Sequence, residues 1–600
     1  MSIYFGVSPS AFLWSLQQVL TLCGTDVGSH STTIHILPDN VLLEVFDFYQ
    51  YSSDNTGRAV WKWHLLVHVC RRWRQIVFAS PHRLNLQILC TTGTRVRENL
   101  CIWPTLPIAI EYRYSERAIR PRGAEDNVIA ALKHRDRICD VSLDIQGSQL
   151  AKVATVMKKP FPVLTRLHVT SDPDDRNVPI LPREFLGRSA PCLQKITLSG
   201  IPYPTLPKLL LSTSNLVALE LRRIPPTGYI SPLVIATCLA ALPKLDAFDI
   251  QFQSATLHHE RIFPPVTRDV LPSLTAFTFK GASEYLEDLV ARIDSPQLDR
   301  ILVVYLNQAV EFQVAQLSRF IVRSAAFKAN PLKHAQATFS DDKVSFDMCR
   351  HELNRHELHP TPCRPPTRIV VSCRGIDWQV PHIAQVLGQF SATLSNVVRL
   401  KFESTDKLLP DDHSKIDGAD VTEWLLLLRQ FSAVQTLHVS EELAKHVSLA
   451  LEGITQEMIA GFLPSINLID LRGPPASSFE KFVALRGLSG HPVTIVDLRM
   501  EREREERREM ERREMRERLM KMQTESERNM ESPWVRKWVR KREPRVRVRD
   551  CKWGWGWELE SWRTSGREEW EINAERNEWE WERQAEGEEW EWERQVEGEE

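Results

Sequence analysis

An eight-residue template recurs through the middle of the chain and constrains its fold more than any other feature. It reads Pro or Ser, any residue, an apolar residue, two variable residues, an apolar residue, a variable residue and a final apolar residue. Residues 162–169, 191–198 and 214–221 match it, and further copies begin at Pro243, Pro272, Pro296, Ser395, Ser432 and Pro464. The first six copies begin 29, 23, 29, 29 and 24 residues apart. A spacing this regular indicates an internal repeat.

Each template ends in an apolar–polar–apolar triplet, which predicts a short β-strand with one buried face. The segments between templates, such as 203–212 and 283–293, predict helices on the convex side. The period is typical of leucine-rich repeats, whose units bury their apolar edges only against their neighbours. We therefore expect an α/β solenoid over residues 137–496. The alternative is an ordinary layered α/β protein, in which such regular strand spacing would be a coincidence.

The polar positions of the template strands should face away from the core, on the concave side, because side chains alternate along a strand. They mix both signs of charge and form no catalytic constellation. No Gly-x-Ser-x-Gly, Gly-x4-Gly-Lys or Gly-x-Gly-x-x-Gly motif occurs, so we expect a non-catalytic protein with no cofactor. The candidate target-binding residues are Arg166, His168, Lys195, Glu220, Asp249 and Arg300, with Arg399, Lys401, His438 and Asp470 at later equivalent positions.

The template is lost between residues 304 and 394, where several potential metal ligands occur. They are Cys349, His351, His356, His359 and Cys363. The five-residue step from His351 to His356 is one residue too long for the zinc-protease pattern and places the imidazoles on different helix faces. Four prolines between 360 and 366 indicate a loop. We expect a solvated polar insertion rather than a zinc site.

Two apolar helices are predicted near the N-terminus. Pro38 and Asp39 begin the first, which carries Leu42, Val45, Phe46 and Tyr49 on one stripe. Val41 and Leu43 lie off this stripe. The second helix carries Leu66, Val69, Cys70, Trp73 and Val77, and Ser80-Pro81 ends it. About forty residues cannot bury this much apolar surface alone, so a partner is implied. The alternative is an ordinary amphipathic hairpin.

At these residues the sequence resembles an F-box. The matching segments are Leu37-Pro38, Val45-Phe46, Val69-Cys70-Arg71-x-Trp73 and Ser80-Pro81-x-x-Leu84. Two features depart from the usual pattern: residues 50–61 make a longer link between the helices, and Asn85 stands where many F-boxes have Trp. From residue 36 to 496 the chain is similar to a large fungal family of F-box proteins with leucine-rich repeats, in which this Asn is not unusual. Segments 80–86, 134–139, 283–289 and 488–492 carry that similarity.

The resemblance implies a substrate receptor of a cullin–RING (SCF-type) ubiquitin ligase. The F-box would bind the SKP adaptor and, through it, the cullin, while the repeats hold a target protein near a ubiquitin-loaded enzyme. The adaptor-binding residues it implies are Leu37, Pro38, Leu42, Val45, Phe46, Val69, Cys70 and Trp73. Eleven cysteines without a Cys-x-x-Cys pair favour reduced thiols, and thus the cytoplasm or nucleus. No apolar run has bilayer-spanning length, so no membrane association is expected.

The last hundred residues differ from the rest in composition. Residues 501–600 hold 24 Lys and Arg against 30 Asp and Glu, and 11 of the 18 Trp. Residues 501–521 predict a solvated helix, and the acidic end predicts disorder. The basic segment 528–552 supports an alternative function, that of a nuclear scaffold or nucleic-acid-binding protein. The expected organisation is an N-terminal extension (1–33), the F-box (34–90), a linker or cap (91–136), the solenoid (137–496) and the tail (497–600).

Overall fold

The computed structural model divides the chain into two units, residues 1–503 and 504–600. In the second unit it describes only positions 507, 510, 512, 515 and 518, all helical, and the rest of the tail, including 528–552, lies outside the described residues. In the first unit it describes residues 37–51, 62–93, 96, 100–101, 103–113, 124–171, 180–254, 267–306, 314–350, 366–373, 375–405, 418–455, 462–472 and 479–497. Among all these residues, no helix has the length and apolar character needed to cross a bilayer.

A sixteen-stranded sheet forms the backbone of the first unit. Its strand order is β1-β2-β3-β4-β5-β6-β7-β9-β11-β14-β13-β12-β15-β16-β17-β18. Neighbouring strands are parallel except at β13. The strands are β1 Ile88–Cys90, β2 Ile108–Arg113, β3 Ile138–Ile145, β4 Arg166–Ser171, β5 Lys195–Ser199, β6 Ala218–Ile224, β7 Ala247–Phe252, β9 Ala276–Gly281, β11 Arg300–Tyr305, β12 His334–Ser340, β13 Lys343–Cys349, β14 Thr367–Val371, β15 Arg399–Ser404, β16 Thr436–Ser440, β17 Leu468–Arg472 and β18 Thr494–Asp497. A second, two-stranded sheet pairs β8 (Asp269–Val270) with β10 (Ile293–Asp294).

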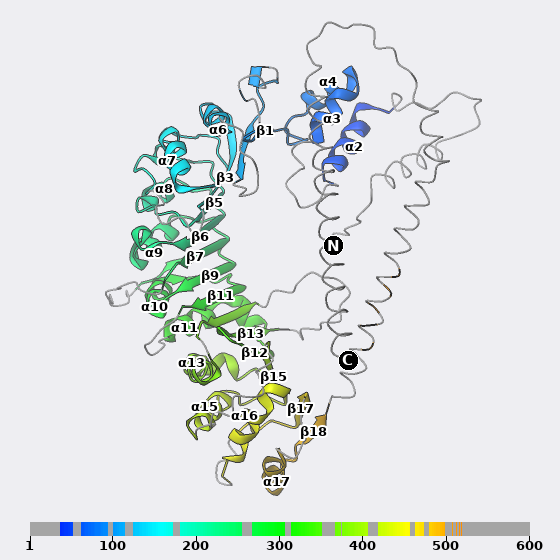
Figure 1. Cartoon of the computed structure of the whole chain (residues 1–600), viewed down its shortest axis with the longest axis vertical. Helices are drawn as coiled ribbons and strands as arrows, with labels where there is room; N and C mark the ends of the chain where they lie inside the picture. The colour runs from blue at the N-terminus through cyan, green and yellow to red at the C-terminus, as the bar shows by residue number, and fades with distance from the viewer. Residues whose placement is uncertain are drawn as a thin grey trace, which may run out of the picture. The chain divides into compact units, whose positions relative to one another are not determined.

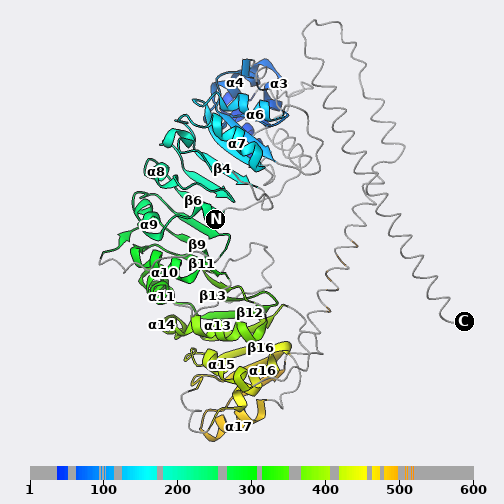
Figure 2. The ribbon, with the colours of Figure 1, turned by 60° about the vertical axis from the view of Figure 1, so that its left-hand side comes forward.

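Helices cover one side of this sheet, as the turned views of Figures 1 and 2 show for α7 to α11. We call the opposite side the outer face. The helices are α6 Ala124–Leu132, α7 Gly147–Val156, α8 Leu206–Leu210, α9 Pro232–Ala240, α10 Ser283–Arg292, α11 Ala315–Arg323, α12 Ala325–Ala329, α13 Ile376–Gly388, α14 Ser391–Leu394, α15 Gly418–Leu428, α16 Glu441–Glu452 and α17 Glu480–Leu488, with 3-10 turns η3 Phe185–Arg188 and η4 Pro226–Gly228. The helix predicted over 283–293 is confirmed, whereas the one predicted over 203–212 shortens to α8.

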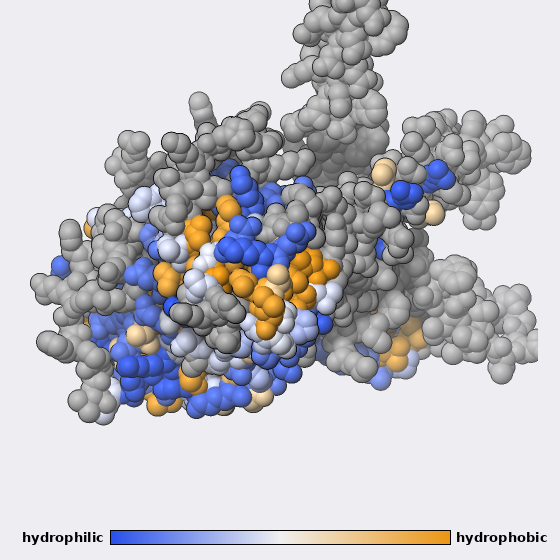
Figure 3. Space-filling view, turned by 90° about the horizontal axis from the view of Figure 1, so that it is seen from below, coloured by the Kyte–Doolittle hydropathy of each residue, from blue (hydrophilic) through white to orange (hydrophobic). Residues whose placement is uncertain are grey.

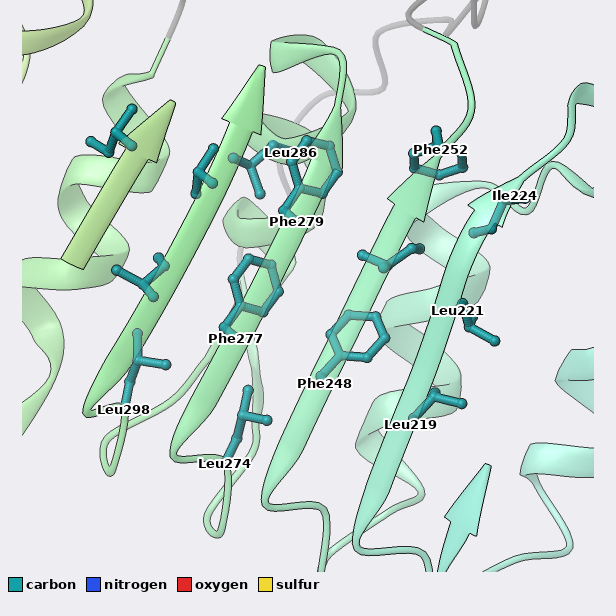
Figure 4. Close-up of a cluster of buried hydrophobic side chains, with 14 of the residues drawn as sticks. Leu219, Leu221, Ile224, Phe248, Phe252, Leu274, Phe277, Phe279, Leu286 and Leu298 are labelled. Carbon is teal, nitrogen blue, oxygen red and sulfur yellow. The ribbon is translucent and has the colours of Figure 1, made fainter. Parts of the chain in front are cut away.

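The template residues form continuous layers in the core. Leu219 of β6 is in register with Phe248 of β7, which is in register with Phe277 of β9. The rings of Phe248 and Phe277 lie 5.8 Å apart, and Figure 4 shows these side chains side by side along adjacent strands. All three are buried. The predicted α/β fold with a long parallel sheet of stacked repeats is therefore confirmed, and the sheet begins with β1 and β2, before residue 137.

The sheet continues through part of the interval in which the template is lost, while the polar insertion expected around its histidines and prolines falls almost entirely outside the described residues. β12 and β13 form an antiparallel hairpin from His334↔Cys349 to Ser340↔Lys343, and the hairpin lies between β14 and β15. The chain reverses over the short turn at Asp341 and Asp342, whereas a parallel connection would need a longer crossover. Cys349 is buried in β13. Residues 351–365, with the three histidines, lie outside the described residues.

The C-terminal end of the sheet also differs from expectation. The last template copy ends at Leu471, but β18 adds a further parallel strand, from Leu468↔Thr494 to Leu471↔Asp497. β18 lacks the full template, which is why the periodicity does not reveal it. Seen from below, apolar residues gather among hydrophilic ones at this end (Figure 3), and Leu488 of α17 is 78% exposed.

Glu287 of α10 caps the next helix of the array. Its Oε2 accepts a hydrogen bond from the Gln316 N–H at 2.7 Å, and its Oε1 accepts one from the Leu317 N–H at 2.8 Å, at the start of α11. Burial raises the pKa of the Glu287 carboxyl to about 7, although these two N–H groups and Arg319 act to lower it. One carboxyl group that titrates near neutral pH thus joins two successive repeats.

Glu287 should stabilise the fold more at pH 5.5 than at pH 8. Its folded pKa of about 7 lies above the ordinary 4.5, so the folded chain binds this proton more tightly than the unfolded chain. The contribution is fully present below pH 4.5 and is lost as the pH rises through 7. Glu287→Gln should therefore remove part of the pH dependence of the unfolding free energy, roughly 2 kcal/mol between pH 5.5 and pH 8. Urea titrations at the two pH values would measure it. Glu441→Gln, at the exposed start of α16, is the control, and a wild-type pH profile for Glu287→Gln would contradict this assignment.

Candidate interaction surfaces

Three helices form a module at the N-terminal end of the first unit: α2 Asp39–Tyr51, α3 Lys62–Val69 and α4 Arg71–Ala79. The single second helix predicted over Leu66 to Val77 is wrong, because the chain breaks at Cys70. Cys70 is extended (φ −157°, ψ 171°), and its Sγ accepts a hydrogen bond from the Trp73 N–H at 3.4 Å. The thiol therefore acts as an N-cap that begins α4 and turns it away from α3.

The interior of this helical module holds much of the predicted motif. Leu42 and Phe46 of α2 are fully buried, and the Phe46 ring lies 4.7 Å from the partly buried ring of Trp73. Arg72 fastens α4 to the start of α2: its guanidinium donates to the Leu37 carbonyl at 2.6 Å and also pairs with Asp39. These contacts stabilise the module itself.

Trp63 joins the helical module to the first strand of the sheet. Its indole is buried, and Nε1 donates a hydrogen bond to the Gln87 carbonyl, one residue before β1, at 3.0 Å. Its ring lies 5.3 Å from that of Trp103 and 6.0 Å from that of Phe78, both edge-on. Trp63 precedes Leu66, the first residue of the predicted second helix, so the sequence pattern gave no sign of its role.

The helical module also exposes apolar side chains that its own core does not use. Leu65 and Val69, one turn apart on α3, are 60% and 58% exposed, and Phe48 of α2 is 52% exposed. Val41 of α2 is exposed as well. Of the predicted adaptor-binding residues, Val69 and Pro38 are exposed, Leu37, Val45, Cys70 and Trp73 are intermediate, and Leu42 and Phe46 are interior. Phe48 and Leu65 were not predicted as surface residues, because they lie outside the apolar stripes of the two predicted helices. Val41 was recognised as lying outside the first stripe.

Asn85 closes the helical module in a left-handed conformation. Its φ is 43°, a region in which Asn is less strained than most L-residues. Its Oδ1 accepts a hydrogen bond from the Gln87 amide at 3.0 Å. An Asn at this position therefore suits the local backbone conformation.

A network of charges crosses the outer face from β3 to β7. Arg166 pairs with Asp140 at 2.7 Å, and Lys195 pairs with Glu220 at 2.7 Å. The charged residues of this part of the face largely satisfy one another, so a partner that binds there must compete with existing ion pairs.

Arg222 links the two acidic members of this network. It reaches Glu220 at 3.1 Å and Asp249 at 2.9 Å. Burial alone would raise the pKa of Glu220, but the hydrogen bond from Lys195 and the charges of Lys195 and Arg222 hold it below its ordinary value. At Asp249 burial prevails and raises the pKa, despite hydrogen bonds from Gln251 and Arg222.

The other predicted target-binding residues lie on the same face. His168 is exposed and contacts the Thr170 hydroxyl at 3.1 Å, and Arg300 of β11 is exposed. Thr197, two residues after Lys195 on the same face of β5, is only 2% exposed, and its hydroxyl donates to Glu220 at 3.3 Å. Lys401 pairs with Glu403 on β15, while the side chain of Asp470 lies outside the described residues.

The described residues offer little for metal or thiol chemistry. Within the described ranges no group of three or more His, Cys, Asp or Glu side chains is arranged to hold a metal ion. Burial raises the pKa of the Cys90, Cys238 and Cys373 thiols to about 11, so they stay protonated at neutral pH.

Comparison with known proteins adds only distant likeness. No family model matches the sequence, and no curated protein is similar to it. Among solved structures, the leucine-rich repeat-containing protein LegL7 from Legionella pneumophila aligns at 15% identity over 58% of this chain and 99% of that protein, with a TM-score of 0.24. At that score the likeness carries no weight, and the fold rests on the strand register of the chain itself.

Proposed function

We propose that the chain is a non-catalytic receptor that holds a target protein on its repeat array and joins a ubiquitin ligase through its helical module. In this proposal the module is an F-box that binds the SKP adaptor and, through it, a cullin. Ubiquitin is then delivered by an enzyme on another subunit, so the receptor works by proximity, without a cofactor. Such a complex works in the cytoplasm or nucleus.

The proposal rests on one observation: the helical module has a buried apolar interior and, on the same helices, further apolar side chains that are exposed. Leu42, Phe46 and Trp63 already give it an interior, yet Phe48, Leu65 and Val69 remain largely exposed on the same helices. Apolar helix faces of this kind are favourable docking sites for other proteins. The F-box-like order of Leu37-Pro38 and Cys70-Arg71-x-Trp73 identifies the SKP adaptor as the partner to test.

The double variant Leu65→Glu/Val69→Glu should lose adaptor binding by at least about a hundredfold, because two carboxylates would replace apolar contacts in the docked interface. Binding to a purified SKP-type adaptor would be measured by calorimetry with the full chain.

The matched control is Leu233→Glu/Val234→Glu on α9, where the same two residue types are also exposed. This control should bind the adaptor as the wild type does, and both variants should keep the wild-type unfolding midpoint. Wild-type affinity in the α3 variant, or no adaptor binding by the wild type, would refute the proposal.

A further inference from the structure

The outer face changes character where β9, β11 and β14 lie side by side. On β3 to β7 its positions are polar or small, but β11 presents Leu302 and Val304 there, and β14 presents Val370. Val304 and Val370 are direct partners in the strand register, and Leu302 precedes Val304 on the same face. The three residues form one apolar patch away from the helices. Val370 is 8% exposed, while the other two are partly exposed.

Cations border this apolar patch. Lys280 of β9 is in register with Val304, Arg300 lies two residues before Leu302 on β11, and Arg368 of β14 is in register with Leu302. Arg368 forms a double hydrogen bond with Asp347 at 2.6 and 2.8 Å. Among the residues that the structure describes, Lys280 and Arg300 have no hydrogen-bonded or ion-paired partner, unlike Arg166, Lys195 and Arg222 of the charge network.

We infer that this patch binds an extended acidic segment of a partner protein, in which apolar side chains alternate with Asp or Glu. The apolar side chains would cover Leu302, Val304 and Val370, and the carboxylates would pair with Lys280 and Arg300. An apolar centre with a charged rim is the usual build of a protein interface. Lys280 and Arg300 favour an acidic partner segment, because they can bind its carboxylates without breaking an ion pair that the structure describes.

This inference deepens the proposed function and rests on it for one point, that the bound segment belongs to a target. Peptide binding to the array is measured without the adaptor. A failure of peptide capture therefore leaves adaptor binding untouched, and a failure of adaptor binding leaves peptide capture untouched.

The test is phage display of random twelve-residue peptides on the full chain, followed by fluorescence anisotropy with the recovered peptides. We expect enrichment of sequences that combine several Asp or Glu with Leu, Ile, Val or Phe. Lys280→Glu/Arg300→Glu should weaken their binding by at least about tenfold, and raised salt should weaken binding to the wild type. The milder pair Lys280→Gln/Arg300→Gln should weaken it less and serves if charge reversal perturbs folding.

The matched control is Lys208→Glu/Lys328→Glu, which reverses two exposed lysines on α8 and α12. It should bind the recovered peptides within about twofold of the wild type. Recovery of peptides without acidic residues, or equal affinity for the wild type and for both the Glu and Gln pairs, would overturn the inference.

Discussion

Replacement of Leu219 by Asp should unfold the repeat array. Leu219 is fully buried in β6, in register with Ile196 of β5 and Phe248 of β7. The aspartate would lose these apolar contacts and place a carboxylate in an apolar layer, where burial of an unpaired charge is strongly unfavourable. We expect the free energy of unfolding to fall by more than about 4 kcal/mol. Urea denaturation followed by circular dichroism would measure it.

Ala218→Asp is the matched control, one position earlier on the same strand. Ala218 lies on the outer face, in register with Lys195. The same new carboxylate would meet solvent and a lysine there, so the unfolding free energy should change by no more than about 0.5 kcal/mol. A larger loss for Ala218→Asp than for Leu219→Asp would mean that the buried and outer faces of β6 have been interchanged.

Trp63→Ala should separate the helical module from the sheet. The substitution removes a buried indole, its hydrogen bond to the Gln87 carbonyl and its edge-on contacts with Phe78 and Trp103. Truncation of a buried Trp costs about 3–5 kcal/mol. Because these contacts join the module to β1, we expect α3 and α4 to lose amide protection in hydrogen exchange, while strands β4 to β9 keep it.

Trp378→Ala provides the comparison, because Trp378 on α13 is 66% exposed. Its loss should shift the unfolding free energy by about 0.5 kcal/mol or less. If the amides of α3 and α4 exchanged as slowly in Trp63→Ala as in Trp378→Ala, Trp63 would not be the residue that joins the module to the sheet.

Much of the solenoid could be predicted from the sequence because its determinants are local. In residues 214–221, Leu216, Leu219 and Leu221 recur at the spacing that buries one face of a strand, and all three are buried. The same alternation placed Arg166 and His168 on the exposed side, where the structure has them. A period of two along the strand leaves no other arrangement, since a shift of one residue would move every apolar side chain into solvent.

The break at Cys70 could not be read from periodicity, because Leu66 and Trp73 fit one continuous helix as well as two. The break depends on a cap, in which the Cys70 thiol accepts the Trp73 N–H, and on Arg72, which reaches back to Leu37. The buried role of Trp63 likewise depends on Trp103 and Gln87, which are distant in sequence.

The sequence by itself determined which residues of each template strand face the core and that the helical module has more apolar surface than it can bury. Only the tertiary structure decided which strands became neighbours. Lys195 pairs with Glu220 because β5 lies beside β6. Lys280 and Arg300 have no ion-pair partner within the described ranges, since the outer-face positions of β9 and β11 carry no acid. The hairpin of β12 and β13 places β14 directly beside β11 and so unites Val304 with Val370. Alternation along a strand is a local property of the backbone, but the partners of a side chain across strands are set by chain connections that carry no periodic signal.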